Sequence, residues 1–254
     1  MKTFSVFSKE YEILFKKNLS TFCKNIEQGS DGYYLARNYG LFFPSCGSNN
    51  KEKIKFIIYG QAVGKGWNNL PHFSVGNIDK AIISRVKEYL NTPDKDETNP
   101  LEWVQNKWSK PGWGMSRSFF WNVCYKLINR YNDLPNDSPD WYNHLIWSNL
   151  MKIAPVESGN PDNFEWSAQL EKSILLFRQE LEEVQPDCAI LLTNWGWAKD
   201  FLSTGYSIKM ITDSEFILAK GSLGKTKVIV TKRPYPNGSN ERCVNEILEI
   251  VYNH

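Results

Sequence analysis

A largely apolar run, Ile54-Lys55-Phe56-Ile57-Ile58-Tyr59, leads directly into the turn residues Gly60-Gln61. Short apolar runs bounded by turn residues are typical of strands that are buried on both faces of a sheet. Glycine at the end of such a strand lets the backbone approach a ligand closely. We therefore predict a buried strand from Ile54 to Tyr59, with the main functional pocket at Tyr59-Gly60-Gln61.

Three further apolar segments have the same character, and segments with helical periodicity separate them along the chain. Strands that alternate with helices form a parallel sheet with helices on both faces, and ligands bind outside the carboxyl ends of the strands. We therefore predict an α/β protein, a three-layer sandwich around a central, mostly parallel, four-stranded sheet. The other predicted strands are Leu145 to Leu150, Cys188 to Leu192 and Lys227 to Thr231; the helices start after Ser8, cover about Ile78 to Leu90, Leu101 to Trp108 and Ser116 to Ile128, end before Pro186, and start again near Ser239.

Length and composition favour one globular domain that spans residues 1–254. The chain has 254 residues, of which 41% are hydrophobic and 23% charged, so it can bury a sizeable core. Residues 1–50 are predicted to form an N-terminal helical extension packed on that domain. The formal net charge of +2 lacks the basic excess of a dedicated duplex-DNA binder, so any nucleic-acid site must be a local patch.

The five cysteines are widely spaced and form no C-x-x-C pair, so a zinc or iron–sulfur site has no support. Cys188 and Cys243 are predicted to be small core residues. The first residues lack a signal-peptide core, and no apolar run reaches the length of a membrane span. We therefore expect a monomeric, cytoplasmic protein that uses no metal, no cofactor and no membrane partner.

Side chains that can bind phosphate follow several of the predicted strands. Lys65 lies in a glycine-rich run, Gly60 to Trp67, where successive N–H groups can form an anion-binding nest. That run is one residue shorter than a P-loop and has no Ser or Thr after Lys65, which argues against binding of a magnesium nucleotide. The candidate phosphate contacts are Lys65, Lys152, Lys232, Arg233 and Ser239, although the plainer interpretation of the cations is that they are solvated, and Ser239 also fits a helix cap.

Two further residues have side chains suited to a flat polar ligand. Phe73 can stack on an aromatic ring, although packing in the core is the better interpretation from its chemistry alone. Asn149 follows the strand that starts at Leu145 and brings one acceptor and two donors, which suit the edge of a base. An asparagine at a strand end can also bond its own backbone, so both interpretations stay open.

In chain order, these segments resemble motifs of the uracil-DNA glycosylase superfamily. One branch of that superfamily carries a Gly-Gln-Asp-Pro-Tyr-His loop followed by Phe-Ser-Val, and other branches carry Gly-Glu-Ala-Pro-Gly. The resemblance covers most of the chain from about Ile54 to the final helix. The matching segments are Gly60-Gln61-Ala62-Val63-Gly64, Phe73-Ser74-Val75, the Trp-Ser-Asn-Leu-Met-Lys segment around Asn149, Gln185-Pro186-Asp187 and Arg233-Pro234-Tyr235-Pro236.

The resemblance implies a base-flipping protein that acts on DNA, single- or double-stranded, with uracil or another damaged base. An extruded base would stack on Phe73, and Asn149 would read its edge together with the backbone groups of Gly60 and Ala62. For hydrolysis of the N-glycosidic bond, the resemblance implies that Gln61 positions a water and that Arg233 stabilises the leaving base anion or holds a phosphate.

Two departures from the family pattern keep a second hypothesis open. The water-orienting Asp of the family falls on Ala62, and the His that supports the leaving uracil falls on Arg233. Glutamine is no general base, and arginine cannot act as an acid near neutral pH. The alternative is therefore a non-catalytic module that binds a nucleic acid or nucleotide in the same pocket. An unrelated α/β hydrolase is the weakest hypothesis, because the chain has no G-x-S-x-G elbow.

Overall fold

The computed structural model of the chain describes residues 7–29, 32–47, 54–62, 71–79, 81–91, 101–108, 118–135, 138–203, 205, 207–233 and 239–252. These residues form two compact units. Unit 1 combines the described residues within Met1–Pro44, Gln61–Thr92 and Asn149–Glu183, and unit 2 combines those within Ser45–Gly60, Pro93–Ser148 and Val184–His254. Most of the predicted N-terminal extension thus falls in unit 1 with two later segments, and the prediction of a single domain stays a prediction.

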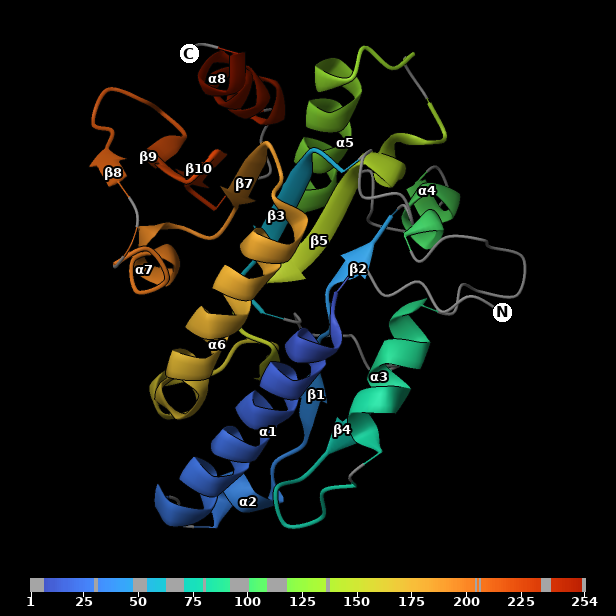
Figure 1. Cartoon of the computed structure of the whole chain (residues 1–254), viewed down its shortest axis with the longest axis vertical. Coiled ribbons are helices and arrows are strands. Elements are labelled where there is room, and N and C mark those ends of the chain that lie inside the picture. Colours follow the sequence, from blue (N-terminus) through green and yellow to red (C-terminus); the bar gives the residue numbers. More distant parts are fainter. Residues whose placement is uncertain are drawn as a thin grey trace. The chain divides into compact units, whose positions relative to one another are not determined.

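Unit 2 is built on a seven-stranded sheet with the strand order β2-β5-β3-β7-β10-β9-β8 (Figure 1). The parallel pairs are β3 with β7 and β7 with β10, whereas β10 with β9, β9 with β8, and β5 with β2 are antiparallel. The strands are β2 (Ser45–Cys46), β3 (Phe56–Gly60), β5 (Leu145–Asn149), β7 (Cys188–Leu191), β8 (Ser207–Met210), β9 (Ile217–Leu223) and β10 (Thr226–Thr231).

The α/β class is therefore confirmed, and the four predicted strands are the consecutive neighbours β5, β3, β7 and β10 of this order. The sheet is larger than the predicted four strands and is mixed, because antiparallel strands extend both of its ends. On one end, β9 turns into β10 at Gly224, which has a φ of 56° and suits a tight hairpin. On the other end, β2 has only two residues and gives no recognisable pattern in the sequence.

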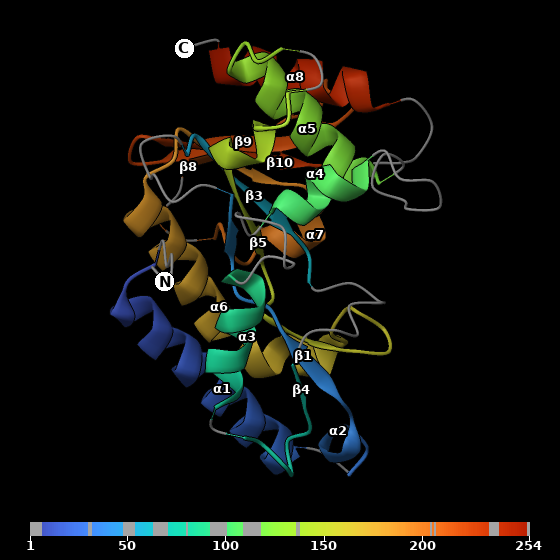
Figure 2. The same cartoon turned by 90° about the vertical axis from the view of Figure 1, so that its right-hand side faces the viewer.

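Helices of unit 2 cover the sheet and contact each other. α5 (Phe119–Tyr131) starts at Ser118, whose hydroxyl accepts a hydrogen bond from the Trp121 backbone N–H. α5 lies beside α8 (Asn240–Tyr252) over one face of the sheet (Figure 2). Unit 2 also contains α4 (Glu102–Trp108), α7 (Trp195–Ala198) and a 3-10 turn (Trp141–His144).

Unit 1 contains a small antiparallel sheet and a pair of long helices. Its strands are β4 (His72–Phe73), β1 (Tyr39–Leu41) and β6 (Ile153–Pro155), with β1 in the middle. The long helices α1 (Lys9–Gly29) and α6 (Asn163–Val184, in unit 1 up to Glu183) lie side by side in both views (Figures 1 and 2). α2 (Tyr33–Ala36) and α3 (Ile82–Asn91) complete the unit.

The two long helices run antiparallel, and polar contacts fix their register. The Ser8 hydroxyl donates to Glu183 Oε1 at 2.5 Å, the Tyr11 hydroxyl donates to Glu180 Oε1 at 2.5 Å, and Asn25 Nδ2 donates to the Ala168 carbonyl at 2.9 Å. Polar side chains therefore occupy the helix interface together with the apolar side chains that the periodicity predicts.

Apolar side chains fill most of the cores of both units, including those of the predicted central strands. All five cysteines lie among the described residues, are buried and form no disulfide, and the burial confirms Cys188 and Cys243 as small core residues. Burial raises the pKa of the Cys243 thiol to about 12. Within the described ranges, no helix combines the length and the apolar character that a membrane crossing requires.

Candidate functional site

Polar contacts hold the turn at the end of β5, residues 149–153, and we call it the Asn149 turn. Lys152 folds back so that its Nζ lies 2.5 Å from the Asn149 carbonyl oxygen. The same ammonium lies 2.7 Å from Glu180 Oε1, and both side chains are completely buried. Because Tyr11 also donates to Glu180, a chain of polar contacts connects α1 and α6 with the carbonyl of Asn149.

Backbone contacts hold the rest of the Asn149 turn. The Met151 N–H donates to the Gln61 carbonyl at 3.0 Å, and the Lys152 carbonyl accepts from the Phe42 N–H at 2.8 Å. The side chain of Gln169 on α6 bonds both backbone groups of Ile153, with distances of 3.1 Å to the nitrogen and 2.7 Å to the oxygen. The structure thus brings the predicted residues Gln61 and Asn149 into two turns that a backbone hydrogen bond connects.

One polar atom of this turn has no partner. Asn149 is 1% exposed, and its Nδ2 has no hydrogen-bond acceptor among the described residues. Buried donors nearly always have an acceptor, because leaving one unpaired costs about 1–3 kcal/mol. A donor that a rigid turn holds without an acceptor can serve the carbonyl oxygen or ring nitrogen of a ligand.

The electrostatics of the turn depend on the buried ammonium. Burial lowers the pKa of Lys152, whereas the adjacent Glu180 carboxylate acts in the opposite direction. Since Lys152 is completely buried, it does not track a phosphate along the surface. The interpretation of Lys152 as a phosphate contact was therefore wrong, because an acidic group of α6 takes its ammonium into the interior.

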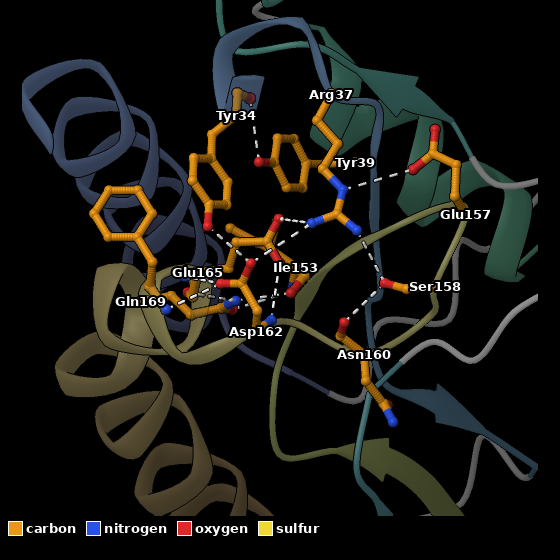
Figure 3. Close-up of polar contacts among 11 residues, drawn as sticks. Tyr34, Arg37, Tyr39, Ile153, Glu157, Ser158, Asn160, Asp162, Glu165 and Gln169 are labelled. Carbon is orange, nitrogen blue, oxygen red and sulfur yellow. Dashed lines mark hydrogen bonds and ion pairs between the residues drawn. The ribbon is translucent and has the colours of Figure 1, made fainter. Parts of the chain in front are cut away.

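A second polar cluster lies at the start of α6 (Figure 3). Arg37 Nη1 lies 2.7 Å from Glu165 Oε1 and 3.9 Å from Asp162 Oδ2. Asp162 and Glu165 also bond each other's backbone N–H groups, which is a capping box at the start of a helix. Burial raises the pKa of the Glu165 carboxyl. Because these groups bond one another, the cluster ties Arg37 to α6.

In unit 2, Asn194 occupies the turn that follows β7. Its φ of 73° and ψ of 156° lie in a region that is almost restricted to glycine, and such strain marks functional positions. Its N–H donates to the Thr231 carbonyl at 3.0 Å, and its Oδ1 accepts from the Arg233 N–H. Asn194 therefore joins the carboxyl ends of β7 and β10 and holds the backbone at Arg233.

The remaining predicted residues of unit 2 lie near strand and helix ends. Gly60 ends β3, next to Tyr59, whose carbonyl accepts from the Leu192 N–H at 3.0 Å. Lys232 and Arg233 follow β10, and their side chains are exposed. Ser239 is buried directly before α8, and its carbonyl accepts from the Cys243 N–H at 3.0 Å.

The remaining predicted residues of unit 1 are Ala62 and Phe73. Ala62 follows Gln61 and is partly exposed. Phe73 is buried in β4, where its ring centroid lies 5.7 Å from that of Tyr39. Stacking of a base on Phe73 therefore requires that this ring be uncovered. Lys65 lies outside the described residues.

No site role was predicted from the sequence for Glu180, Gln169, Tyr11 or the strained Asn194. The buried face of α6 includes Glu165, Gln169 and Glu180 as well as the apolar side chains of Phe177 and Leu181. The sequence does contain a signal for this polar face. Glu165, Gln169 and Glu180 are separated by about whole numbers of helical turns, which places them on one side of the helix.

Comparison with known proteins, the arrangement of possible metal ligands and the groove of unit 2 give no indication of function. No protein-family model and no curated protein matches the chain. Among the described residues, no group of three or more His, Cys, Asp or Glu side chains is arranged to hold a metal ion. A groove of about 700 Å³ in unit 2, between β8 and α8, is lined by Lys209, Asp213, Lys220 and Glu246 among others, and by none of the predicted site residues.

Proposed function

We propose that the protein binds a nucleobase, within a nucleic acid or a nucleotide, at the Asn149 turn. The observation that carries the proposal is the buried Nδ2 of Asn149, which has no acceptor among the described residues, in a turn whose neighbouring backbone groups are bonded. A base edge presents carbonyl oxygens and ring nitrogens that such a donor can bond. Within unit 1, Gln61 is bonded to the same turn and Ala62 follows it with a small side chain, which leaves room for a flat ring.

In unit 2, we propose Lys232 and Arg233 as phosphate contacts, because both side chains are exposed. Arginine offers a planar fork of donors that suits phosphate oxygens, and Asn194 fixes the backbone at Arg233. Phosphate contacts give a binding constant that falls with salt concentration, whereas a base contact does not depend on counterion release. Salt dependence thus separates the two kinds of contact.

Hydrolysis of an N-glycosidic bond to uracil or another damaged base is the second candidate function. It is favoured by the same unpartnered Nδ2, since a donor aimed at a departing base stabilises its negative charge. Ala62 supplies no carboxylate to orient a water, so binding without chemistry needs fewer assumptions.

Binding is tested with short oligonucleotides that contain uracil, hypoxanthine or xanthine, single- and double-stranded, by fluorescence anisotropy. Asn149→Ala is expected to weaken binding of the preferred oligonucleotide about tenfold, as the loss of a buried hydrogen bond of about 1.4 kcal/mol requires. The matched control is Asn129→Ala on α5, which removes another buried asparagine with an unpartnered amide atom. Equal affinities of wild type and Asn149→Ala would contradict the proposed site.

The same oligonucleotides decide between the two functions. Alkaline cleavage of the DNA after incubation with stoichiometric protein reports abasic sites. Strand scission that depends on Asn149 establishes the glycosylase, and binding without scission establishes the non-catalytic module. Absence of both for every base and strand form rejects the proposed function.

A further inference from the structure

Lys152 and Glu180 form an ion pair that stability alone does not explain. Both side chains are completely buried, and their charged atoms lie 2.7 Å apart. Removing two charges from water generally costs more than their attraction returns, and well-packed apolar residues of similar volume serve stability equally well. The role of such a buried pair is therefore expected to lie in the groups that it holds in place.

The pair holds the residue that the proposed function uses. Lys152 Nζ reaches the Asn149 carbonyl at 2.5 Å while it contacts Glu180 on α6. A fixed carbonyl restricts the backbone of Asn149, and with it the direction in which the side chain leaves the chain. Tyr11 holds Glu180 from α1, so both long helices of unit 1 determine the position of Asn149.

The other contacts of the turn act in the same sense. Met151 is bonded to Gln61, and Ile153 is bonded to Gln169 through both backbone groups. A donor held in this way needs no reorganisation when a ligand arrives, and in a low-dielectric interior its hydrogen bond is stronger than in water. The arrangement suits the binding of a ligand better than it suits folding alone.

We infer that Lys152 and Glu180 are positioning residues, which set the orientation of the Asn149 amide for ligand binding. The inference rests on the proposed function for its purpose, but its geometric part can be measured without a ligand. In this role, the pair touches no ligand and acts only through the carbonyl of Asn149. Its removal must therefore loosen the Asn149 turn even where the fold keeps its stability.

The test uses the full chain with the near-isosteric double variant Lys152→Met/Glu180→Gln, which removes both charges and keeps an acceptor for Tyr11. The first readout is the exchange rate of the Met151 amide hydrogen, whose bond to Gln61 closes the turn. We expect exchange at least tenfold faster than in wild type at an unchanged urea midpoint. Unchanged exchange would overturn the inference.

The second readout is affinity for the uracil oligonucleotide, which is expected to fall at least tenfold. A folded double variant that binds as tightly as wild type would also overturn the inference. If the wild type binds no oligonucleotide, the proposed function fails, and the Met151 exchange rate still decides whether the pair positions the turn. If the double variant does not fold, Tyr11→Phe/Lys152→Met/Glu180→Leu undergoes the same measurements.

The matched control removes another ion pair of unit 1. Lys87 on α3 forms this ion pair with Glu12 on α1, and both side chains are partly exposed. Lys87→Met/Glu12→Gln is expected to leave both the Met151 exchange rate and the affinity within about twofold of wild type. If the control loosens Met151 as much as the double variant does, the effect is a general loss of charge and not positioning, which overturns the inference.

Discussion

The interiors of the two units differ in chemistry. The sheet of unit 2 is buried among apolar side chains. Among the described residues, the buried polar residues of unit 2 as a whole are Ser45, Asn129, Ser138, Ser148, Thr193, Thr226, Thr231 and Ser239. Unit 1 buries several amides and also charges, and among the described residues the buried charged ones are Lys152, Glu165 and Glu180, all in unit 1.

The difference follows from how each unit satisfies its backbone. Unit 2 pairs seven strands, so ladder hydrogen bonds absorb most backbone groups. Unit 1 has strands of two or three residues, and side chains of α6 replace the missing ladder, as Gln169 does at Ile153. We therefore expect unit 1 to be sensitive to lost charges and amides, and unit 2 to added volume.

The largest effect is expected from Lys152→Met alone. This change leaves the Glu180 carboxylate buried without its cation, and breaking a buried pair from one side costs about 3–5 kcal/mol of unfolding free energy. Adding Glu180→Gln should restore that loss, so that the urea midpoint returns to the wild-type value. Urea unfolding measures both variants. A single variant that loses less than about 1 kcal/mol would show that unit 1 tolerates an unpaired buried charge.

Gln169→Leu should have the next largest effect. It removes both hydrogen bonds to Ile153 and leaves two buried backbone groups unpaired, at a cost of about 2–4 kcal/mol. The control is Gln179→Leu on the same helix, whose amide bonds the partly exposed Glu183. Equal unfolding free energies for the two variants would contradict the view that α6 replaces a strand ladder.

Gly221→Ala tests the sensitivity of unit 2 to shape. An added Cβ would lie 2.2 Å from the Ser207 carbonyl oxygen in the neighbouring strand, so the β8–β9 pair must shift, at about 1–3 kcal/mol. Gly196→Ala is the control, because nothing lies within 4 Å of its added Cβ. Thermal unfolding compares the two variants. A Gly221→Ala protein as stable as the control would contradict the expectation that unit 2 is sensitive to added volume.

The smallest effect is expected from a surface charge of unit 2. Hydrogen bonds from Lys126, and the charges of Lys126 and Arg130, lower the pKa of Glu241 below its ordinary value of 4.5. Because the folded pKa is the lower one, the stabilisation is present above the unfolded value and disappears as the pH falls through the folded value.

Glu241→Gln should therefore lower the free energy of unfolding by less than about 1 kcal/mol at neutral pH, since the ion pair is half exposed. At about pH 2, where the carboxyl is protonated, it should lower it by nothing. The measurement is the urea midpoint of both proteins across this pH range. A difference that persists unchanged in acid would show that the lost stability has another origin than the carboxylate.

Much of unit 2 could be predicted from the sequence, because its central strands are continuous apolar runs. Ile54 to Tyr59 and Cys188 to Leu192 match β3 and β7 closely. The short strands β1, β4 and β6 escaped prediction, since two or three residues show no periodicity and form only where a partner strand is present.

The candidate site could be predicted only in part. Asn149 and Gln61 were recognised because they lie at the carboxyl ends of buried strands, and a backbone bond between Met151 and Gln61 connects their turns. The role of Lys152 was not predictable locally, because its partner Glu180 lies on a later helix that is distant in sequence. Contacts between segments distant in sequence leave no local pattern.

The most direct test of the account is the side-chain amide signal of Asn149 in ¹⁵N–¹H spectra, assigned by its absence from Asn149→Ala. The account predicts that this signal shifts as the uracil oligonucleotide saturates the protein, while the signal of the buried Asn129 stays in place. Saturable binding that leaves the Asn149 signal unmoved would contradict the central claim that this donor contacts the base.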